Sequence, residues 1–488
     1  MFKEQLSRIK SKLTKALEVD SKFKVFGATS HKYVVNPPIP CLELESFELK
    51  YGVKLPQDYR EFLLEIGNGG AGPFHGLYPL GEGIDELSAK SETVSLPACV
   101  RPDMTDEEWR ERSKKIVDDE GISDEDYDSE SSVLYSGILP IGSQGCTYLH
   151  ALVLTGEYAG KVMNVDMDFH KPKFCYEQNF LDWYERWLDE VISGILLADG
   201  PTWFGYSKGG GDIDLLNFFD SVDDLSSKKD ALLGLQKLPS INECSCDRLK
   251  LICDSEIGEL RELAIHMLVK FSYKKSVMIL EELVSGSDEE CKLACQAIYW
   301  YQKEYSAKWS SQIMDRISTV KNSETFSFML YILKEAKFDY GDLLIPFYSH
   351  ESEEMRVTSY YSLGLLKTKS KYRSIFVLGL KDKSPRVVHT TLQALPDERN
   401  PLLFEEFVGI IRRFKTDEHY ILTNLNQILR NWGYKDQTEF INYFKLQMYR
   451  ESKAENNPKN EDSSLAWKQV VAENSQKNFL QKIFAFFR

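Results

Sequence analysis

Apolar side chains recur at helical spacing at both ends of the first two hundred residues. Leucine and isoleucine stand three or four positions apart over residues 1–19, which predicts an amphipathic helix. A second helix is expected near Leu42. A third should begin at Pro56 or Gln57, because proline fits the first turn of a helix.

Strand patterns lie between these helices and a further one. Runs rich in β-branched and aromatic residues predict strands over 138–141, 148–154 and 160–165. A helix is expected over residues 179–196. Residues 1–206 therefore predict an α+β domain, in which a mixed sheet is flanked by helices.

From residue 213 to 448 the strand patterns vanish and a helical repeat replaces them. Equivalent helix positions recur every 30 to 33 residues, with small or apolar residues three and six positions after most of them. These positions are Lys229, Arg261, Lys292, Thr325, Arg356, Arg386 and His419. A single helix pair cannot bury its own apolar face, so the pattern predicts an all-α solenoid of stacked helix pairs. Residues 353–357 and 383–387 resemble HEAT repeats.

Polar and glycine-rich segments divide this multidomain chain. A glycine-rich linker is expected over residues 207–212 and a polar linker over 449–464. Residues 465–488 predict a last amphipathic helix. It lacks the strongly basic polar face of a membrane anchor, so capping the end of the solenoid is the better reading.

The net charge of −15 argues against nucleic-acid binding, which needs clustered lysine and arginine. It fits either high solubility or a basic protein partner, since opposite fields favour association. The charged N-terminus has no signal-peptide pattern, and no apolar run is long enough to span a bilayer. These features predict a cytoplasmic protein without a membrane span.

Motifs for metal or cofactor chemistry are weak. Nine cysteines include Cys244 and Cys246, whose spacing is too short for a zinc pair, and Cys291 and Cys295, which fall within an apolar helical pattern. Val162 stands where a phosphate-binding loop needs serine or threonine. The sequence therefore predicts no enzyme, no cofactor and no metal, although a catalytic site assembled from distant residues stays open.

The segment from Leu55 to Leu80 carries a family pattern. A Phe-Glu pair precedes Leu-Pro-x-Asp-Tyr, an apolar helix and a glycine-rich corner, and it resembles the SUKH superfamily of fungal cell-wall regulators and bacterial immunity proteins. The matching residues are Phe47, Glu48, Leu55, Pro56, Asp58, Tyr59, Phe62, Gly67, Asn68, Gly69 and Gly70. The resemblance implies an α+β domain over about residues 1–205 and a protein-binding function. Most of these side chains are expected to be structural, and Gly69 or Gly70 should adopt a positive φ.

An acidic segment near residues 103–130 interrupts the family pattern and is expected to be a surface insertion, partly helical around Trp109. Its last part is the candidate partner-binding site, although such a run is also typical of a solvated loop. The candidate residues are Asp118, Asp119, Glu120, Asp124, Glu125, Asp126, Asp128 and Glu130.

Two functions follow from this reading. The first is an immunity or antitoxin-like protein that neutralises a toxic effector, such as a basic nuclease, by direct contact. The alternative is an intracellular adaptor or regulatory scaffold that binds several protein partners through the solenoid. A hydrolase is a minor third possibility. A toxin gene directly upstream would favour the first.

The glycine run at 209–211 should separate two independently folding units, because the strand patterns end just before the repeat begins. Limited proteolysis near this run is expected to release two stable fragments. A single cooperative unfolding unit without cleavage there would contradict the prediction.

Overall fold

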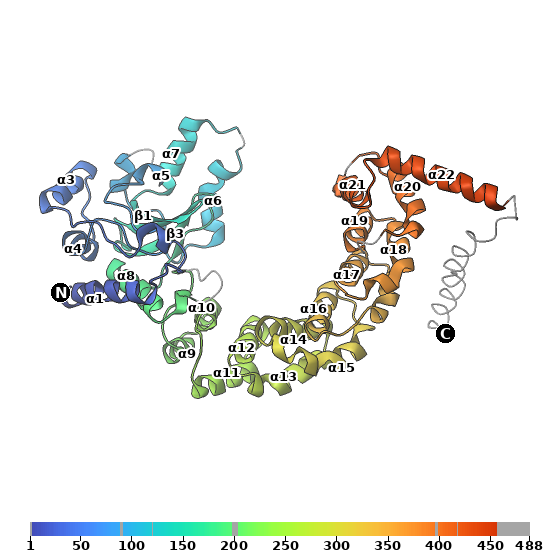
Figure 1. Ribbon diagram of the computed structural model, residues 1–488. Helices are drawn as coiled ribbons and strands as arrows, with labels where there is room; N and C mark the ends of the chain where they lie inside the picture. Colours follow the sequence, from blue (N-terminus) through green and yellow to red (C-terminus); the bar gives the residue numbers. More distant parts are fainter. Residues whose placement is uncertain are drawn as a thin grey trace. The chain divides into compact units, whose positions relative to one another are not determined.

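The computed structural model describes residues 2–87, 91–119, 121–197, 204–395, 399–416 and 418–455. The chain divides into two compact units, Met1–Phe271 and Ser272–Arg488 (Figure 1). The predicted C-terminal helix over 465–488 lies outside the described residues.

A four-stranded sheet forms the centre of the first unit, with its strands in the order β1-β2-β3-β4. Every pairing in the described sheet is antiparallel. The strands are β1 (Ile138–Gly145), β2 (Tyr148–Val153), β3 (Val162–Asp166) and β4 (Lys173–Phe174). The predicted α+β class is confirmed, and the three predicted strands are present, but the described sheet is antiparallel rather than mixed because consecutive strands pair as neighbours.

Both faces of this sheet are apolar, because alternate residues of a strand point to opposite faces. On β2, Leu152 joins one buried cluster, whereas Leu149, Ala151 and Val153 join another. The sheet therefore separates two cores and needs cover on both sides.

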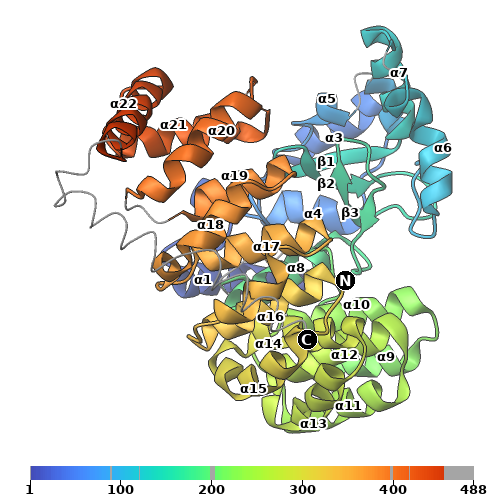
Figure 2. The ribbon, with the colours of Figure 1, turned by 90° about the vertical axis from the view of Figure 1, so that its right-hand side faces the viewer.

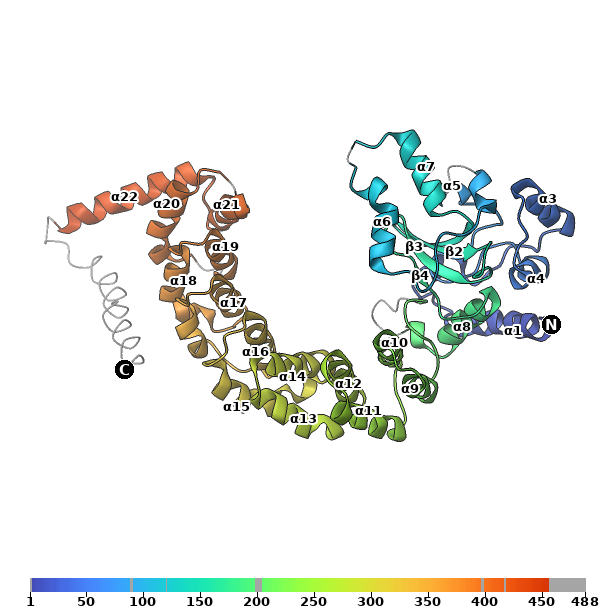
Figure 3. The same cartoon turned by 180° about the vertical axis from the view of Figure 1, so that it is seen from behind.

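The first face is covered by helices from both ends of the domain, and Figure 3 shows the first and the last of them below the sheet. They are α1 (Lys3–Val19), α3 (Cys41–Tyr51), α4 (Gln57–Glu65) and α8 (Phe180–Ile192). All contribute buried side chains to the cluster that contains Phe62, Phe180 and Trp187. Three short elements accompany these helices: α2 (Ala28–His31) lies between α1 and α3, η1 (Ser91–Ser95) follows α4 in the chain, and η2 (Ile195–Leu197) follows α8.

Ion pairs fasten α1 to α8. Glu185 accepts hydrogen bonds from Arg8 Nε at 2.8 Å and from Lys12 Nζ at 2.9 Å. Burial alone would raise the pKa of Glu185, but these hydrogen bonds outweigh it and lower the pKa to about 2. Helix α1 is thus an integral part of the first layer.

The opposite face is covered by α5 (Ile84–Leu87), α6 (Asp106–Val117) and α7 (Asp124–Leu134), which Figure 1 shows beyond the sheet from α1 and α8. Trp109, Ile116 and Leu134 are buried in the second core. The acidic segment is therefore helical around Trp109, as predicted. It is also a structural layer of the domain rather than only a surface insertion.

The helical region begins directly after the glycine run, and its first helices belong to the first unit. These are α9 (Asp212–Ser221), α10 (Leu225–Gln236), α11 (Glu243–Ser255) and α12 (Gly258–Phe271). A Cβ on Gly209 would stand 2.1 Å from Arg186 Nε, and Tyr176 on the α+β domain bonds to Asp230 on α10. Secondary structure thus changes class at the predicted linker, whereas the division into compact units falls after Phe271.

The second unit consists of helices throughout its described part (Figure 2). Neighbouring helices pack as pairs, among them α13 with α14, α15 with α16, and α18 with α19. The helices of this unit, with the short 3-10 helices marked η, are α13 (Tyr273–Ser285), α14 (Asp288–Tyr301), η3 (Lys303–Tyr305), α15 (Ser306–Ile317), α16 (Ser323–Glu335), η4 (Asp342–Phe347), α17 (Glu353–Gly364), η5 (Lys369–Tyr372), α18 (Arg373–Leu380), α19 (Pro385–Ala394), η6 (Pro401–Leu403), α20 (Phe404–Arg413), η7 (Glu418–Tyr420), α21 (Ile421–Asn431) and α22 (Gln437–Glu455). Residues 449–455, assigned to a polar linker by sequence, continue α22.

The repeat alignment holds in most helices and is one residue out in α16. Cys295 and Ile298, three and six positions after Lys292, are fully buried. In α16 the buried positions are instead Met329 and Ile332, so Phe328 and Tyr331 turn partly to the surface. A one-residue shift rotates the helix by about 100°, which explains this difference.

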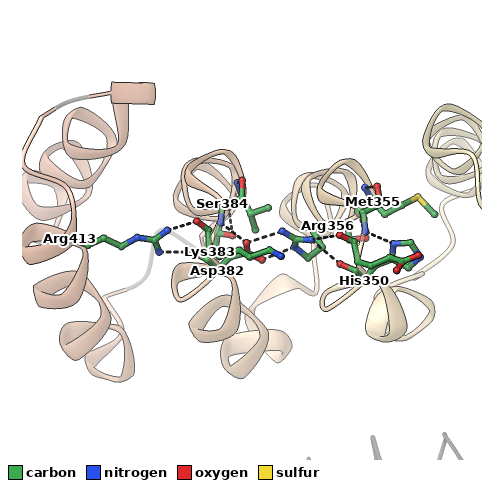
Figure 4. Close-up of polar contacts among 12 residues, drawn as sticks. His350, Met355, Arg356, Asp382, Lys383, Ser384 and Arg413 are labelled. Carbon is green, nitrogen blue, oxygen red and sulfur yellow. Dashed lines mark hydrogen bonds and ion pairs between the residues drawn. The ribbon is translucent and has the colours of Figure 1, made fainter.

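A buried arginine links successive helix pairs near α17 (Figure 4). Arg356 makes two hydrogen bonds to the Asp382 carboxylate, at 2.7 and 3.0 Å, and donates to the carbonyl oxygen of His350. Arg413 then donates to the carbonyl oxygens of Asp382 and Lys383. Such bidentate contacts fix the orientation of neighbouring repeats as well as their distance.

The glycine-rich corner brings three backbone segments together. Gly70 forms isolated bridges with Val35 and Leu77, and Leu77 in turn pairs with Gly142 on β1. Gly69 and Gly70 have φ values of +82° and +95°, so the predicted positive φ is confirmed. A Cβ on Gly70 would stand 2.6 Å from the Val34 carbonyl oxygen.

Replacing Gly70 with valine should lower the free energy of unfolding by about 1–3 kcal/mol, because the new side chain meets both a strained φ and the Val34 backbone. Gly156→Val is the matched control: its φ is +82° but no atom lies within 4 Å of its Cβ. Chemical denaturation should show the larger loss for Gly70→Val. Equal losses would mean that the close approach of Val34 is unimportant.

Candidate functional site

Glu48 of the family motif lies buried at the end of α3 and gathers contacts around the turn that leads to α4. Its carboxylate accepts hydrogen bonds from the Leu55 backbone N–H at 3.0 Å and from Lys54 Nζ at 2.8 Å, and Arg60 Nη1 lies 3.1 Å away. Burial raises the pKa of Glu48, but these contacts outweigh it, so the pKa lies below its ordinary value. Glu48 therefore has a structural role.

Asp58 performs a similar task at the start of α8. Its Oδ2 accepts a hydrogen bond from the backbone N–H of Leu181 at 3.2 Å. A residue of α4 therefore supplies the acceptor for a backbone N–H in the first turn of α8, which has no partner within its own helix. Burial raises the pKa of Asp58 despite these backbone hydrogen bonds. Tyr59 and Phe62 pack edge-on against Phe180, with ring centroids 4.7 and 5.0 Å apart.

The remaining motif residues shape the corner. Asn68 Oδ1 accepts the Leu80 N–H at 2.7 Å, and a Cβ on Gly67 would meet the Asn36 carbonyl oxygen. Leu55 is buried and Pro56 precedes α4, while Phe47 contacts Tyr51 beside the core. The motif thus encodes the fold, because its polar groups are engaged in hydrogen bonds within the domain.

The acidic candidates spread over the outer layer and do not form one site. Asp118 ends α6, and Asp119 accepts the Gly121 N–H at 3.0 Å. Glu130 pairs with Lys115 on α6 and so helps to join the two helices. Glu120 lies outside the described residues.

Three candidates occupy the first turn of α7, where negative charge is favoured by the helix dipole. They are Asp124, Glu125 and Asp126. Ser123 accepts the Asp126 N–H at 3.2 Å, and the Asp126 carboxylate accepts the Ser123 hydroxyl at 2.9 Å. Part of the acidic run therefore serves to start a helix, although all three side chains are exposed.

Asp128 differs, because it borders a hollow of about 320 Å³ between α5, α7 and the turn that follows β3. Three further carboxylates line this hollow: Asp85, Glu86 and Asp168. Sequence analysis missed all three, since they lie outside the acidic segment and only the fold brings them beside Asp128.

A second hollow of about 250 Å³ lies at β3 and is lined by residues of both charges, including Asp166, Lys171 and Lys173. Each of these three is already paired: Asp166 with His170, Lys171 with Asp106, and Lys173 with Asp230. This hollow consequently offers little free charge to a ligand.

The cysteines weighed as metal ligands do not assemble. Cys246 and Cys253 are buried in α11, Cys244 is exposed, and the Sγ atoms of Cys291 and Cys295 lie 4.0 Å apart within α14. Within the described residues, no three His, Cys, Asp or Glu side chains are grouped so as to hold a metal ion. Of the helices described, none has the length and apolar character that crossing a bilayer requires.

These features define an α+β domain whose motif residues maintain the fold and whose charged outer layer faces solvent, followed by a long helical region. Residues 38–186 match the SMI1 / KNR4 family (SUKH-1), which confirms the predicted resemblance. The match begins before α3, ends within α8 and includes the acidic segment, but leaves out α1 and the helical region. No curated protein matches the chain, and no solved structure matches it.

Glu48→Gln should lower the free energy of unfolding by about 1–3 kcal/mol at neutral pH, because the buried Glu48 carboxylate loses the charge that pairs with Lys54 and Arg60. The folded pKa of Glu48 is depressed, so this contribution is present above the unfolded pKa of about 4.3 and is lost as pH falls through the folded value. Denaturation of both proteins from neutral to acid pH should show the difference shrinking. A difference that does not depend on pH would contradict this role.

Proposed function

We propose that the chain is an immunity or antitoxin-like protein that binds a toxic effector protein directly and neutralises it. The SUKH-1 match over residues 38–186 is the observation that carries the proposal, since the resemblance implies a protein-binding domain that often acts in this way. A non-enzymatic role fits the motif, whose polar groups are engaged within the fold.

Charge supports a basic effector as the partner. The chain carries a net charge of −15, and the outer layer of the α+β domain exposes Asp124, Glu125 and Asp126. A nuclease must attract nucleic acid with a positive surface, to which such a layer is complementary. Contacts of this kind chiefly raise the association rate and weaken with salt.

One observation favours the alternative, a scaffold that binds partners through its helical region. Aromatic side chains form a row across α14, α16 and α17 in the second unit. Trp300 is 50% exposed and contacts Phe328 with ring centroids 5.8 Å apart. Tyr299 lies 5.2 Å from Tyr331, and Tyr361 is 51% exposed. Exposed aromatic residues at this density are typical of protein interfaces.

If a toxin gene lies directly upstream, co-expression with the effector that it encodes tests both proposals. The intact chain is expected to restore growth and to bind the effector in a pull-down. Reversing Asp124, Glu125 and Asp126 to lysine should slow association strongly at low salt, with a smaller effect at high salt. Circular dichroism must verify that α7 persists, since lysine in a first turn costs about 0.3–1 kcal/mol per residue.

The matched control reverses three exposed carboxylates of the helical region, Asp254, Glu262 and Glu282, and so changes net charge equally. The scaffold would be favoured if the α7 reversal variant still binds the effector while this control loses binding. The same holds if a Trp300→Ala, Tyr361→Ala double variant loses binding. Failure of the intact chain to rescue growth would overturn the immunity proposal.

A further inference from the structure

The hollow beside Asp128 combines an aromatic floor with a carboxylate rim. The floor is formed by Tyr127 of α7, by Tyr135, which caps the C-terminal end of that helix, and by Phe169 of the turn after β3. The carboxylates around it are Asp85, Glu86, Asp128 and Asp168. The four carboxylate residues are exposed, whereas Tyr135 is 1% exposed. The rim is therefore accessible. Tyr135 and Phe169 belong to the second core, whereas Tyr127 is 38% exposed.

The floor is rigidly built. Phe169 has a φ of +63°, and Trp109 Nε1 donates to its carbonyl oxygen at 2.7 Å. Its ring lies edge-on to Tyr127 at 5.7 Å and stacks on Tyr135 at 6.1 Å. The Tyr135 hydroxyl donates to the Asp166 carbonyl oxygen at 3.2 Å. These contacts hold the rings in place before anything binds, which lowers the entropic cost of binding.

Negative charge around the floor is not neutralised by the described part of the chain. No ion pair there involves Asp85, Glu86, Asp128 or Asp168, although other acids of the same layer are paired, such as Asp106 with Lys171. Tyr78 donates a long hydrogen bond of 3.3 Å to Glu86, and Thr147 one of 3.5 Å to Asp168. Burial and the charges of Asp128 and Asp168 raise the pKa of Tyr127, which reflects this negative field.

An aromatic surface surrounded by carboxylates is complementary to an organic cation. Ring faces attract ammonium and guanidinium groups, and carboxylates accept their hydrogen bonds. The volume of about 320 Å³ lies at the low end of the range for ligand pockets, so it suits a single long side chain. The rim carboxylates are not grouped as metal ligands among the described residues, which suits a dispersed charge better than a metal ion.

We infer that this hollow receives a lysine or arginine side chain projecting from the surface of a basic protein partner. The inference rests on the proposed function and locates its central contact at Asp128 and Asp168. The first-turn residues of α7 would then act through the long-range field, whereas the hollow would supply the short-range contact that holds the complex together.

A fluorescein-labelled nona-arginine peptide serves as the probe, with nona-lysine in parallel and a nona-glutamate peptide as the negative control. Anisotropy titrations use the full-length chain at low and physiological salt. Asp128→Asn with Asp168→Asn should weaken binding of the basic peptides by about 10-fold or more. Tyr127→Leu should weaken it by roughly 3- to 10-fold, whereas Tyr127→Phe, which keeps the ring, should bind like the parent.

The matched control is Glu107→Gln with Glu111→Gln. Both residues are exposed on α6. Their substitution removes the same charge from the same layer, but away from the hollow. It should change binding less than 2-fold if the hollow is the site. Equal weakening by both double variants would show that only net charge matters and would overturn the inference, as would unchanged binding by the hollow variants.

The two proposals can fail separately. Peptide binding that depends on Asp128, Asp168 and Tyr127, together with failed rescue against the effector, would uphold the hollow and overturn the immunity function. Rescue by the intact chain that persists fully in the hollow variants would uphold immunity and overturn the hollow as its contact. Circular dichroism spectra and melting curves of each variant separate these outcomes from misfolding.

Discussion

The need to cover both faces of one small sheet determines the architecture of the α+β domain. Each central strand sends apolar side chains to both sides, so neither face can be left in water. Leu139 and Val162 face one layer, and Met163 and Val165 face the other. Apolar burial contributes about 25 cal/mol per Å², and an uncovered face would leave a large apolar patch. The acidic segment packs against the sheet as a second layer, because Trp109 and its neighbours complete the second core.

This constraint explains why helices and strands were largely predictable from sequence while the layers were not. Periodicity located α1, α3, α4, α8 and the three longer strands, because each carries a dense apolar pattern. It did not reveal the second layer. In α6 the core residues Trp109 and Ile116 stand seven positions apart among charged side chains, so the segment looks like a solvated loop. Strand β4 spans only two residues and leaves no pattern.

The candidate site was predictable only in part, for a topological reason. The acidic run led to Asp128, but its companions come from α5 and from the turn after β3, about forty positions away on either side. Nothing local distinguishes Asp168 from other surface acids. Its position depends on Phe169, a non-glycine residue in the left-handed region whose carbonyl oxygen is held by Trp109. Such a turn is set by tertiary contacts, and these override the local backbone preference.

Acidic residues of the outer layer also differ in what they do, which limits what a charge run can indicate. Asp126 bonds to the residue that caps α7, and Glu130 pairs with Lys115 between the helices, so both have roles in an isolated domain. The Asp128 and Asp168 side chains neither cap a helix nor pair with a basic residue in the described part of the chain. Both border the hollow whose floor is made of aromatic rings. Like charges held near one another are unfavourable unless a cation joins them. Their placement is explained better by an incoming positive group than by the stability of the fold.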